Sequence, residues 1–178
     1  MSPIAVVVGP PGAGKTTIGE GLAAALGVGF RDTDADVEAA AGKPITDIFT
    51  QDGEAVFRAA EAAAVATALV EHGGVLALGG GAILAEATRA LLVEHTVVFL
   101  NVGMAEGVRR TGLSAARPLL AGVNPRATFK LLLDQRLPLY REVATIEVPT
   151  DAAVPEEIIA NLVAALGARA GTTPEGEQ

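Results

Sequence analysis

The chain has 178 residues, 13 Lys and Arg against 21 Asp and Glu, a formal net charge of -8 and no cysteine. This length predicts one domain with a sizeable core, and the acidic balance without a basic run argues against a nucleic-acid or anionic-membrane surface. The lack of cysteine excludes disulfides, thiolate catalysis and Cys-ligated metals. With neither a targeting pattern nor a stretch of about 20 apolar residues, we expect a cytoplasmic protein.

Short apolar segments rich in Val, Ile and Leu alternate with helical patterns along the chain. Strands are expected at 4–8, 28–31, 75–78, 96–101 and 145–148, and helices at 15–26, 35–41, 45–50, 54–72, 85–94, 104–111, 125–137 and 155–166. The alternation predicts an α/β fold, with a five-stranded parallel sheet covered by helices on both faces. We expect a single domain over residues 1–167 and a disordered tail over residues 168–178.

Residues 9–16, Gly-Pro-Pro-Gly-Ala-Gly-Lys-Thr, match the pattern G-x-x-x-x-G-K-[ST] between a predicted strand and a predicted helix. The glycines let backbone N–H groups converge on a polyphosphate at the helix N-terminus. Lys15 places a cation on the β and γ oxygens, and the Thr16 hydroxyl can ligate Mg²⁺. The alternative is a turn that binds nothing, which the strand before it and the helix after it disfavour. The segment therefore predicts a P-loop that binds ATP with Mg²⁺.

Two acidic residues follow the second predicted strand. Asp32 and Asp34 are two positions apart, so their side chains share a face if the segment is extended. A partner for Mg²⁺ and a base that orients the acceptor are the two roles available to them. Two acids that cap the following helix are the alternative.

Charged residues and glycines further along the chain have both a functional and a purely structural interpretation. Arg58 and Glu61, at i and i+3 on an Ala-rich helix, form either an anion-binding pair or a solvated ion pair. Gly79, Gly80 and Gly81 after the third strand either present backbone donors to a ligand or form a flexible turn.

Small residues and arginines between the sixth and seventh helices have the composition of a lid. We expect this lid at about residues 112–124, with Arg117 neutralising charge on the transferring phosphoryl group. A surface loop with incidental arginines is the alternative. Arg136, two residues before Pro138, either meets an anion or complements the end of a helix dipole.

From Val6 to about Leu166 the chain resembles the shikimate kinases, and it looks closest to their actinobacterial members. The matching motifs are the P-loop, Asp32-Thr33-Asp34, Asp52-Gly53-Glu54 with Phe57-Arg58 and Glu61, Leu78-Gly79-Gly80-Gly81, Arg117-Pro118-Leu119-Leu120, and Arg136 with Pro138-Leu139-Tyr140. The resemblance implies a three-layer P-loop kinase fold with a lid. It also implies ATP-dependent phosphorylation of the shikimate 3-hydroxyl to shikimate 3-phosphate, a step of aromatic amino-acid biosynthesis.

The resemblance further implies a role for each matched residue. The catalytic residues would be Asp34, Lys15 and Arg117. Shikimate would be bound by Asp34, Phe49, Phe57, Arg58, Glu61, Gly79, Gly80, Gly81 and Arg136. ATP would be bound by Gly12, Ala13, Gly14, Lys15, Thr16, Thr17, Arg110, Arg117 and Pro155. Mg²⁺ would be held by Thr16 and by Asp32, the latter through water.

Two other functions stay open from the residues alone. The first alternative is another small-molecule P-loop kinase, for gluconate or a nucleoside monophosphate. The second is a nucleotide-binding module without turnover. The low aromatic content argues against stacking of an acceptor base, and a neutral hydroxylic acceptor would not need both Arg58 and Arg136. No exposed apolar stripe is evident, so we expect a monomer whose partners are ATP and shikimate.

Overall fold

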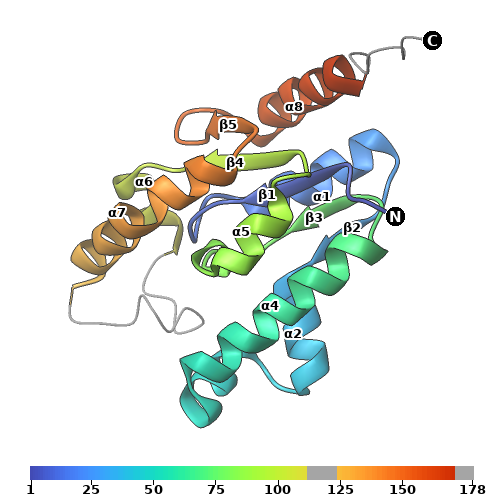
Figure 1. Cartoon of the computed structure of the whole chain (residues 1–178). Helices are drawn as coiled ribbons and strands as arrows, with labels where there is room; N and C mark the ends of the chain where they lie inside the picture. The colour runs from blue at the N-terminus through green and yellow to red at the C-terminus, as the bar shows by residue number, and fades with distance from the viewer. Residues whose placement is uncertain (112–123, 171–178) are drawn as a thin grey trace.

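The structure is a computed structural model that describes residues 1–111 and 124–170. Within these residues, five strands form one parallel sheet in the order β2-β3-β1-β4-β5 (Figure 1). The strands are β1 (Ala5–Val8), β2 (Phe30–Asp32), β3 (Val75–Ala77), β4 (Val97–Asn101) and β5 (Ile146–Pro149). The predicted α/β class and the parallel sheet are confirmed.

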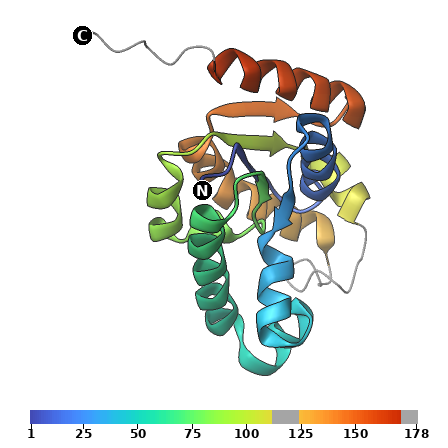
Figure 2. The ribbon, with the colours of Figure 1, turned by 90° about the vertical axis from the view of Figure 1, so that its right-hand side faces the viewer.

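Helices cover both faces of the sheet. They are α1 (Lys15–Leu26), α2 (Thr33–Ala41), α3 (Ile45–Asp47), the π-helix η1 (Ile48–Asp52), α4 (Glu54–Glu71), the 3-10 turn η2 (Ala82–Leu84), α5 (Glu86–Leu92), α6 (Met104–Thr111), α7 (Pro125–Val143) and α8 (Pro155–Ala170). α1 and α8 pack side by side on one face, whereas α4, α5 and the end of α7 lie on the other (Figures 1 and 2). The fold therefore has three layers.

The core follows from the alternation of side chains along the strands. In β1, Ala5 and Val7 pack toward α1 and α8, whereas Val6 and Val8 pack toward α4 and α5. All four residues of β1 are at most 1% exposed. This two-sided burial explains why the segment reads as an unbroken apolar run.

α7 is longer than the sequence pattern predicts. It continues through Pro138 to Val143, whereas we expected an end at Leu137. Proline removes one main-chain hydrogen bond from a helix. Beyond it, Tyr140 is fully buried and its ring stacks on Phe99 of β4 with centroids 5.0 Å apart, a contact that favours continuing the helix.

One expected boundary is also corrected. α8 runs through Gly167 to Ala170, so residues 168–170 are helical rather than the start of a tail. Asn124, at the end of the predicted lid, caps α7, because its side chain accepts from Ala127 N–H at 3.1 Å. The rest of the predicted lid, residues 112–123, and residues 171–178 lie outside the described residues.

Across residues 1–111 and 124–170, none of the helices combines the length and the hydropathy needed to cross a bilayer.

Candidate active site

The predicted site residues gather at one edge of the sheet. The P-loop follows β1, α2 follows β2, and Gly79 comes shortly after β3. In a parallel sheet these positions all lie beyond the carboxyl ends of the strands, where open α/β sheets bind their ligands. The order of the strands places β1 between β3 and β4, so the P-loop lies at the centre of this edge.

The P-loop wraps around the start of α1. Gly12 and Gly14 have φ of 78° and 90°, a region that favours glycine, and Gly14 is the N-cap of α1. The Lys15 ammonium donates to the carbonyl oxygens of Gly9 at 2.9 Å and Pro10 at 3.1 Å. The lysine thus lies within the loop, at the positive end of a helix, where a polyphosphate binds.

The Asp32 carboxylate forms hydrogen bonds with both α1, which follows the P-loop, and α2. It ends β2 and caps α2, with its Oδ1 accepting from Asp34 N–H at 2.9 Å. Its Oδ2 accepts from the Thr16 hydroxyl at 3.4 Å. A hydroxyl and a carboxylate side by side fit Mg²⁺, which takes oxygen ligands and needs only one or two from the protein when phosphates and water supply the rest.

Asp34 lies in the first turn of α2, so the condition under which Asp32 and Asp34 would share a face of an extended segment is not met. The capping interpretation holds for Asp32 alone. Within the described residues, Asp34 Oδ1 is buried and has no hydrogen-bond partner. Burial, followed by the negative charge of Asp32, raises the pKa of Asp34 from 3.8 to about 6, while the charge of Lys15 opposes the shift. An unpaired carboxylate of this kind is suited to accept a proton near neutral pH.

Arg58 and Glu61 form a buried pair rather than a solvated one. Arg58 Nη1 donates to Glu61 Oε2 at 2.7 Å and Nη2 to Glu54 Oε1 at 3.4 Å. The side chain of Glu61 is 4% exposed and that of Arg58 is 22% exposed. Burial raises the pKa of Glu61, and the Arg58 charge opposes this rise. Glu61 therefore holds one edge of the guanidinium and leaves Arg58 partly accessible.

Arg136 lies on the inner side of α7 and is 5% exposed. It forms no salt bridge with any residue in the described ranges. The helix-dipole interpretation is wrong, because α7 continues for nearly two turns beyond Arg136, to Val143. A buried cation without a carboxylate partner is costly, and a bound anion compensates that cost.

The three glycines after β3 let these charged groups approach the backbone closely. A Cβ at Gly79 would lie 2.6 Å from Glu61 Oε1, and one at Gly81 would lie 2.6 Å from Arg58 Cζ. A Cβ at Gly80 would lie 3.3 Å from Pro11 of the P-loop and 3.6 Å from Arg136 Nη1. Residues 79–81, the triple-glycine segment, therefore touch both the P-loop and the charged side chains.

We refer to the group around this segment as the acceptor cluster. It comprises Asp34, Arg58, Glu61, Gly79, Gly80, Gly81 and Arg136.

The two phenylalanines of the prediction lie beside Arg58. Phe57 is 4% exposed and packs with Val37 and Ile48, which supports its assignment to the core. Phe49 is half-buried, with its ring 4.7 Å from that of Phe57. Arg58 Cζ lies 5.2 Å from the centre of the Phe57 ring. Phe57 thus supports the guanidinium, and Phe49 remains the more accessible of the two rings.

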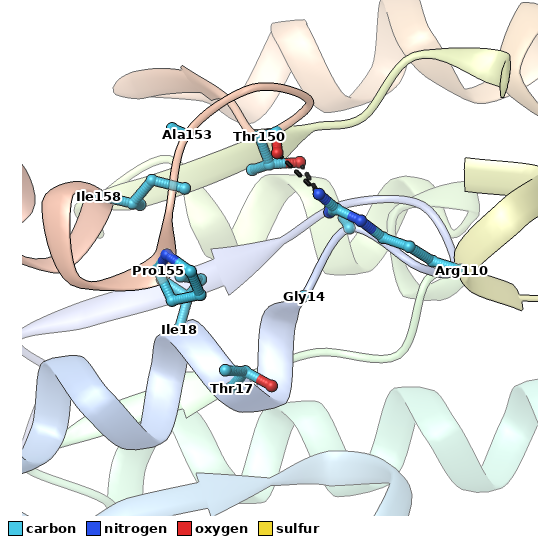
Figure 3. Close-up of a pocket in the computed structure, with 9 residues that line it drawn as sticks. Gly14, Thr17, Ile18, Arg110, Thr150, Ala153, Pro155 and Ile158 are labelled. Atoms are coloured by element: carbon cyan, nitrogen blue, oxygen red, sulfur yellow. Dashed lines mark hydrogen bonds between the residues drawn. The ribbon is translucent and has the colours of Figure 1, made fainter. Parts of the chain in front are cut away.

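A cavity of about 260 Å³ lies on the other side of the P-loop (Figure 3). It is lined by Ala13, Gly14, Thr17, Ile18, Arg110, Thr150, Ala153, Pro155 and Ile158. Arg110 crosses its edge and donates to Thr150 O at 2.8 Å and to Gly12 O at 3.3 Å. Apolar walls with one guanidinium suit the flat base of a nucleotide whose phosphates lie on the P-loop.

Sequence reasoning missed three residues of this region. Thr33 and Tyr140 contact the triple-glycine segment, and Thr150 lies at the nucleotide cavity. The sequence held a signal for two of them: Thr33 stands between two selected acids, and Thr150 comes two residues after the predicted strand 145–148. Tyr140 lies beyond the helix end that we expected at Leu137. Arg117 lies outside the described residues.

Comparisons with known proteins agree with this geometry. Residues 11–167 match the family described as Shikimate kinase. A shikimate kinase of Saccharopolyspora erythraea is 71% identical over 163 residues, covering 92% of this chain and 93% of the relative. One of Salinispora arenicola is 62% identical over 168 residues, covering 94% and 100%.

A solved structure supports the same conclusion. The shikimate kinase from Acinetobacter baumannii, in complex with shikimate, superposes with a TM-score of 0.90 at 35% identity, covering 95% of this chain and 94% of that one. The match in fold and the match in sequence both extend over nearly the whole chain. The chain therefore belongs to the shikimate kinase family.

Proposed function

We propose that this chain transfers the γ-phosphoryl group of ATP to the 3-hydroxyl of shikimate, giving ADP and shikimate 3-phosphate. The observation that carries the proposal is the acceptor cluster beside the P-loop. In it, two arginines and Asp34, whose Oδ1 has no hydrogen-bond partner among the described residues, surround the same backbone segment. Shikimate combines a carboxylate with hydroxyl groups on a ring, so each polar part of the substrate has a partner there.

The two arginines take the substrate carboxylate. Arg58 is held by Glu61 and Glu54, and the nearly buried Arg136 lacks a carboxylate partner among the described residues. An anion between two guanidinium groups gains charge-assisted hydrogen bonds and offsets the cost of burying Arg136. Gly80 and Gly81 contribute backbone N–H groups to the hydroxyls, Gly79 lets Asp34 and Glu61 approach the segment, and Phe49 and Phe57 flank the ring.

Asp34 takes the reacting hydroxyl. The hydroxyl oxygen forms a bond to the γ-phosphorus, the bond from that phosphorus to the bridging oxygen breaks, and ADP leaves with the bond electrons. The hydroxyl proton passes to Asp34. Because the transition state of phosphoryl transfer is loose, orienting the nucleophile contributes more than removing its proton early. Lys15 stabilises the charge on the phosphoryl oxygens.

Thr16 and Asp32 are the residues that would hold Mg²⁺. Their adjacent oxygens match its preference for oxygen ligands. When bound with ATP, the ion neutralises charge on the phosphate oxygens. The nucleotide site would be completed by Gly12, Ala13, Gly14 and Thr17. Arg110 and Pro155 would lie beside the adenine.

Three further predictions rest on the sequence. The resemblance assigns Arg117 to the transferring phosphoryl group, on a lid that starts near residue 112. The net charge of -8 and the lack of a basic run favour small-molecule partners over nucleic acid or membrane. A monomer in the cytoplasm is the expected state, which light scattering and cell fractionation test.

An assay of ADP release tests the proposed function. The purified chain is given ATP and Mg²⁺ with shikimate, gluconate, a nucleoside monophosphate or no acceptor. We expect release with shikimate alone. Release with gluconate or a nucleotide would assign another kinase, and release with no acceptor, or none at all, would contradict phosphorylation of shikimate.

The raised pKa of Asp34 predicts a pH profile. Because Asp34 must be ionised to accept the proton and its pKa is about 6, kcat/KM for shikimate should fall about tenfold per pH unit below that value. The measurement is kcat/KM between pH 5 and 8 at saturating ATP. A profile that stays level down to pH 5 would exclude a carboxylate of raised pKa as the proton acceptor.

Arg110 provides a test of the nucleotide cavity. Replacing Arg110 with alanine removes a wall and its bonds to Thr150 and Gly12, so we expect KM for ATP to rise about tenfold with KM for shikimate within about twofold of wild type. Arg109→Ala is the matched control, because Arg109 and Arg110 both pair with Glu106, whereas Arg109 is 72% exposed and outside the cavity. Equal effects of the two substitutions would remove Arg110 from the ATP site.

A further inference from the structure

The triple-glycine segment has no side chains of its own to hold it, although the proposed function uses its backbone. Glycine loses more conformational freedom on ordering than any other residue, so three in succession are costly to fix. Its conformation must therefore come from bonds to its neighbours.

Among the residues that the structure describes, main-chain bonds tie the segment only to the turn that follows it. Ala82 N–H donates to Gly79 O at 3.1 Å, and Leu84 N–H donates to Gly81 O at 3.0 Å. Both bonds close the η2 turn. They leave the N–H of Gly79 and the carbonyl of Gly80 to be satisfied from elsewhere.

Two buried hydroxyl groups supply these bonds. Thr33 Oγ1 accepts from Gly79 N–H at 3.3 Å, and the Tyr140 hydroxyl donates to Gly80 O at 2.5 Å. Both residues are 0% exposed. Tyr140 is held in turn by its stack on Phe99, so its hydroxyl is fixed against the central layer of the fold.

Two N–H donors of the segment then lack an acceptor among the described residues. All three carbonyls and the first N–H of the segment are engaged, and no described residue accepts from the N–H groups of Gly80 or Gly81. Thr33 directly precedes Asp34 on α2, and Tyr140 lies one turn after Arg136 on α7. The same two helices thus position charged groups of the acceptor cluster and the backbone donors between them.

We infer that Thr33 and Tyr140 are positioning residues for the acceptor: their hydroxyls hold the triple-glycine segment so that the Gly80 and Gly81 N–H groups are preorganised to donate to it. The inference rests on the proposed function, in which this acceptor is shikimate. Neither hydroxyl needs to touch the substrate: Thr33 acts through the glycine backbone, and Tyr140 acts through the glycine backbone and through its interaction with Arg136.

Kinetics of two conservative variants test the inference. Thr33→Val and Tyr140→Phe each remove one hydroxyl and keep the shape of the side chain. Each should raise KM for shikimate about tenfold and keep KM for ATP within about twofold, because the P-loop is unchanged. Thr33→Ser restores the acceptor oxygen and should return KM for shikimate to near the wild-type value.

Thr145→Val is the matched control for a purely structural effect. Thr145 Oγ1 accepts from Val97 N–H at 2.8 Å, so the control loses the same kind of bond at the start of β4, away from the carboxyl edge of the sheet. It should leave both KM values within about twofold of wild type. Two results would contradict the inference. One is an equal change of both KM values in all three variants, Thr33→Val, Tyr140→Phe and Thr145→Val. The other is a wild-type KM for shikimate in Thr33→Val and Tyr140→Phe.

Amide hydrogen exchange gives a second measurement that needs neither turnover nor a fully stable variant. In wild type without ligand, the Gly79 amide should exchange at least about tenfold more slowly than those of Gly80 and Gly81. Shikimate should then slow Gly80 and Gly81. Equal exchange at all three glycines would overturn the inference even in an active enzyme. If Gly79 is protected but no shikimate is phosphorylated, the proposed function is wrong, whereas the role of the two hydroxyls in holding the triple-glycine segment is supported.

Discussion

Replacing Asp34 with asparagine is expected to lower kcat with shikimate by a factor of about 10²–10⁴, the range for losing a positioned general base. Asparagine keeps the size of the side chain but cannot accept the hydroxyl proton. ATP binding should survive, because Lys15 and Thr16 are untouched. The measurements are kcat by ADP release and the affinity for ADP by titration calorimetry.

The same variant should not be less stable than wild type. The pKa of Asp34 rises from 3.8 to about 6 on folding, so the folded state holds the proton more tightly than the unfolded chain does. The stability that this group contributes is therefore present below about pH 4 and lost as the pH rises toward about 6. At pH 7.5 the ionised Asp34 opposes folding, and Asp34→Asn should melt at or above the wild-type temperature.

Asp36→Asn is the control for Asp34. Asp36 lies on the same helix and pairs with Arg31 at 2.7 Å instead of contacting the acceptor cluster. It should keep kcat within about twofold of wild type. Wild-type turnover by Asp34→Asn, or an equal loss in both variants, would remove Asp34 from the chemistry.

Local sequence signals were enough to predict the sheet and the P-loop. β1 is buried on both faces, and such a strand reads as a continuous apolar run. The glycines of the P-loop occupy positive φ angles that their spacing already indicated. The resemblance assigns Arg58 and Arg136, which are 78 positions apart, to one site, and in the structure both lie against the triple-glycine segment.

Tertiary contacts decided what the sequence pattern could not. Pro138 predicted a helix end, but a residue beyond it, Tyr140, is buried against Phe99 and donates to Gly80, and no local rule contains that contact. Likewise, the start of α2 at Thr33 turns Asp34 toward Gly79 rather than along a strand. Thr33 stands between two selected acids, but no local rule contains its bond to Gly79, which is 46 positions away.

Replacing Arg58 with lysine is expected to raise KM for shikimate about 10–100-fold while kcat changes less. The guanidinium donates to Glu61 at 2.7 Å and to Glu54 at 3.4 Å, and it lies against the face of Phe57. A lysine carries the charge but cannot donate to Glu61 and to a substrate carboxylate in the same forked geometry. Hydrogen bonds to charged groups contribute about 1.5–3 kcal/mol each, which corresponds to the expected range of KM.

Arg31→Lys separates loss of binding from loss of structure. Arg31 also pairs with two carboxylates, Asp36 and Glu71, and its side chain is 26% exposed, close to the 22% of Arg58. The two substitutions therefore remove the same chemical feature from similar surroundings, and only Arg58 belongs to the acceptor cluster. We expect Arg31→Lys to keep KM for shikimate within about twofold of wild type. If Arg58→Lys does the same, the substrate carboxylate is bound elsewhere, since a carboxylate held by both Arg58 and Arg136 cannot lose one fork without loss of affinity.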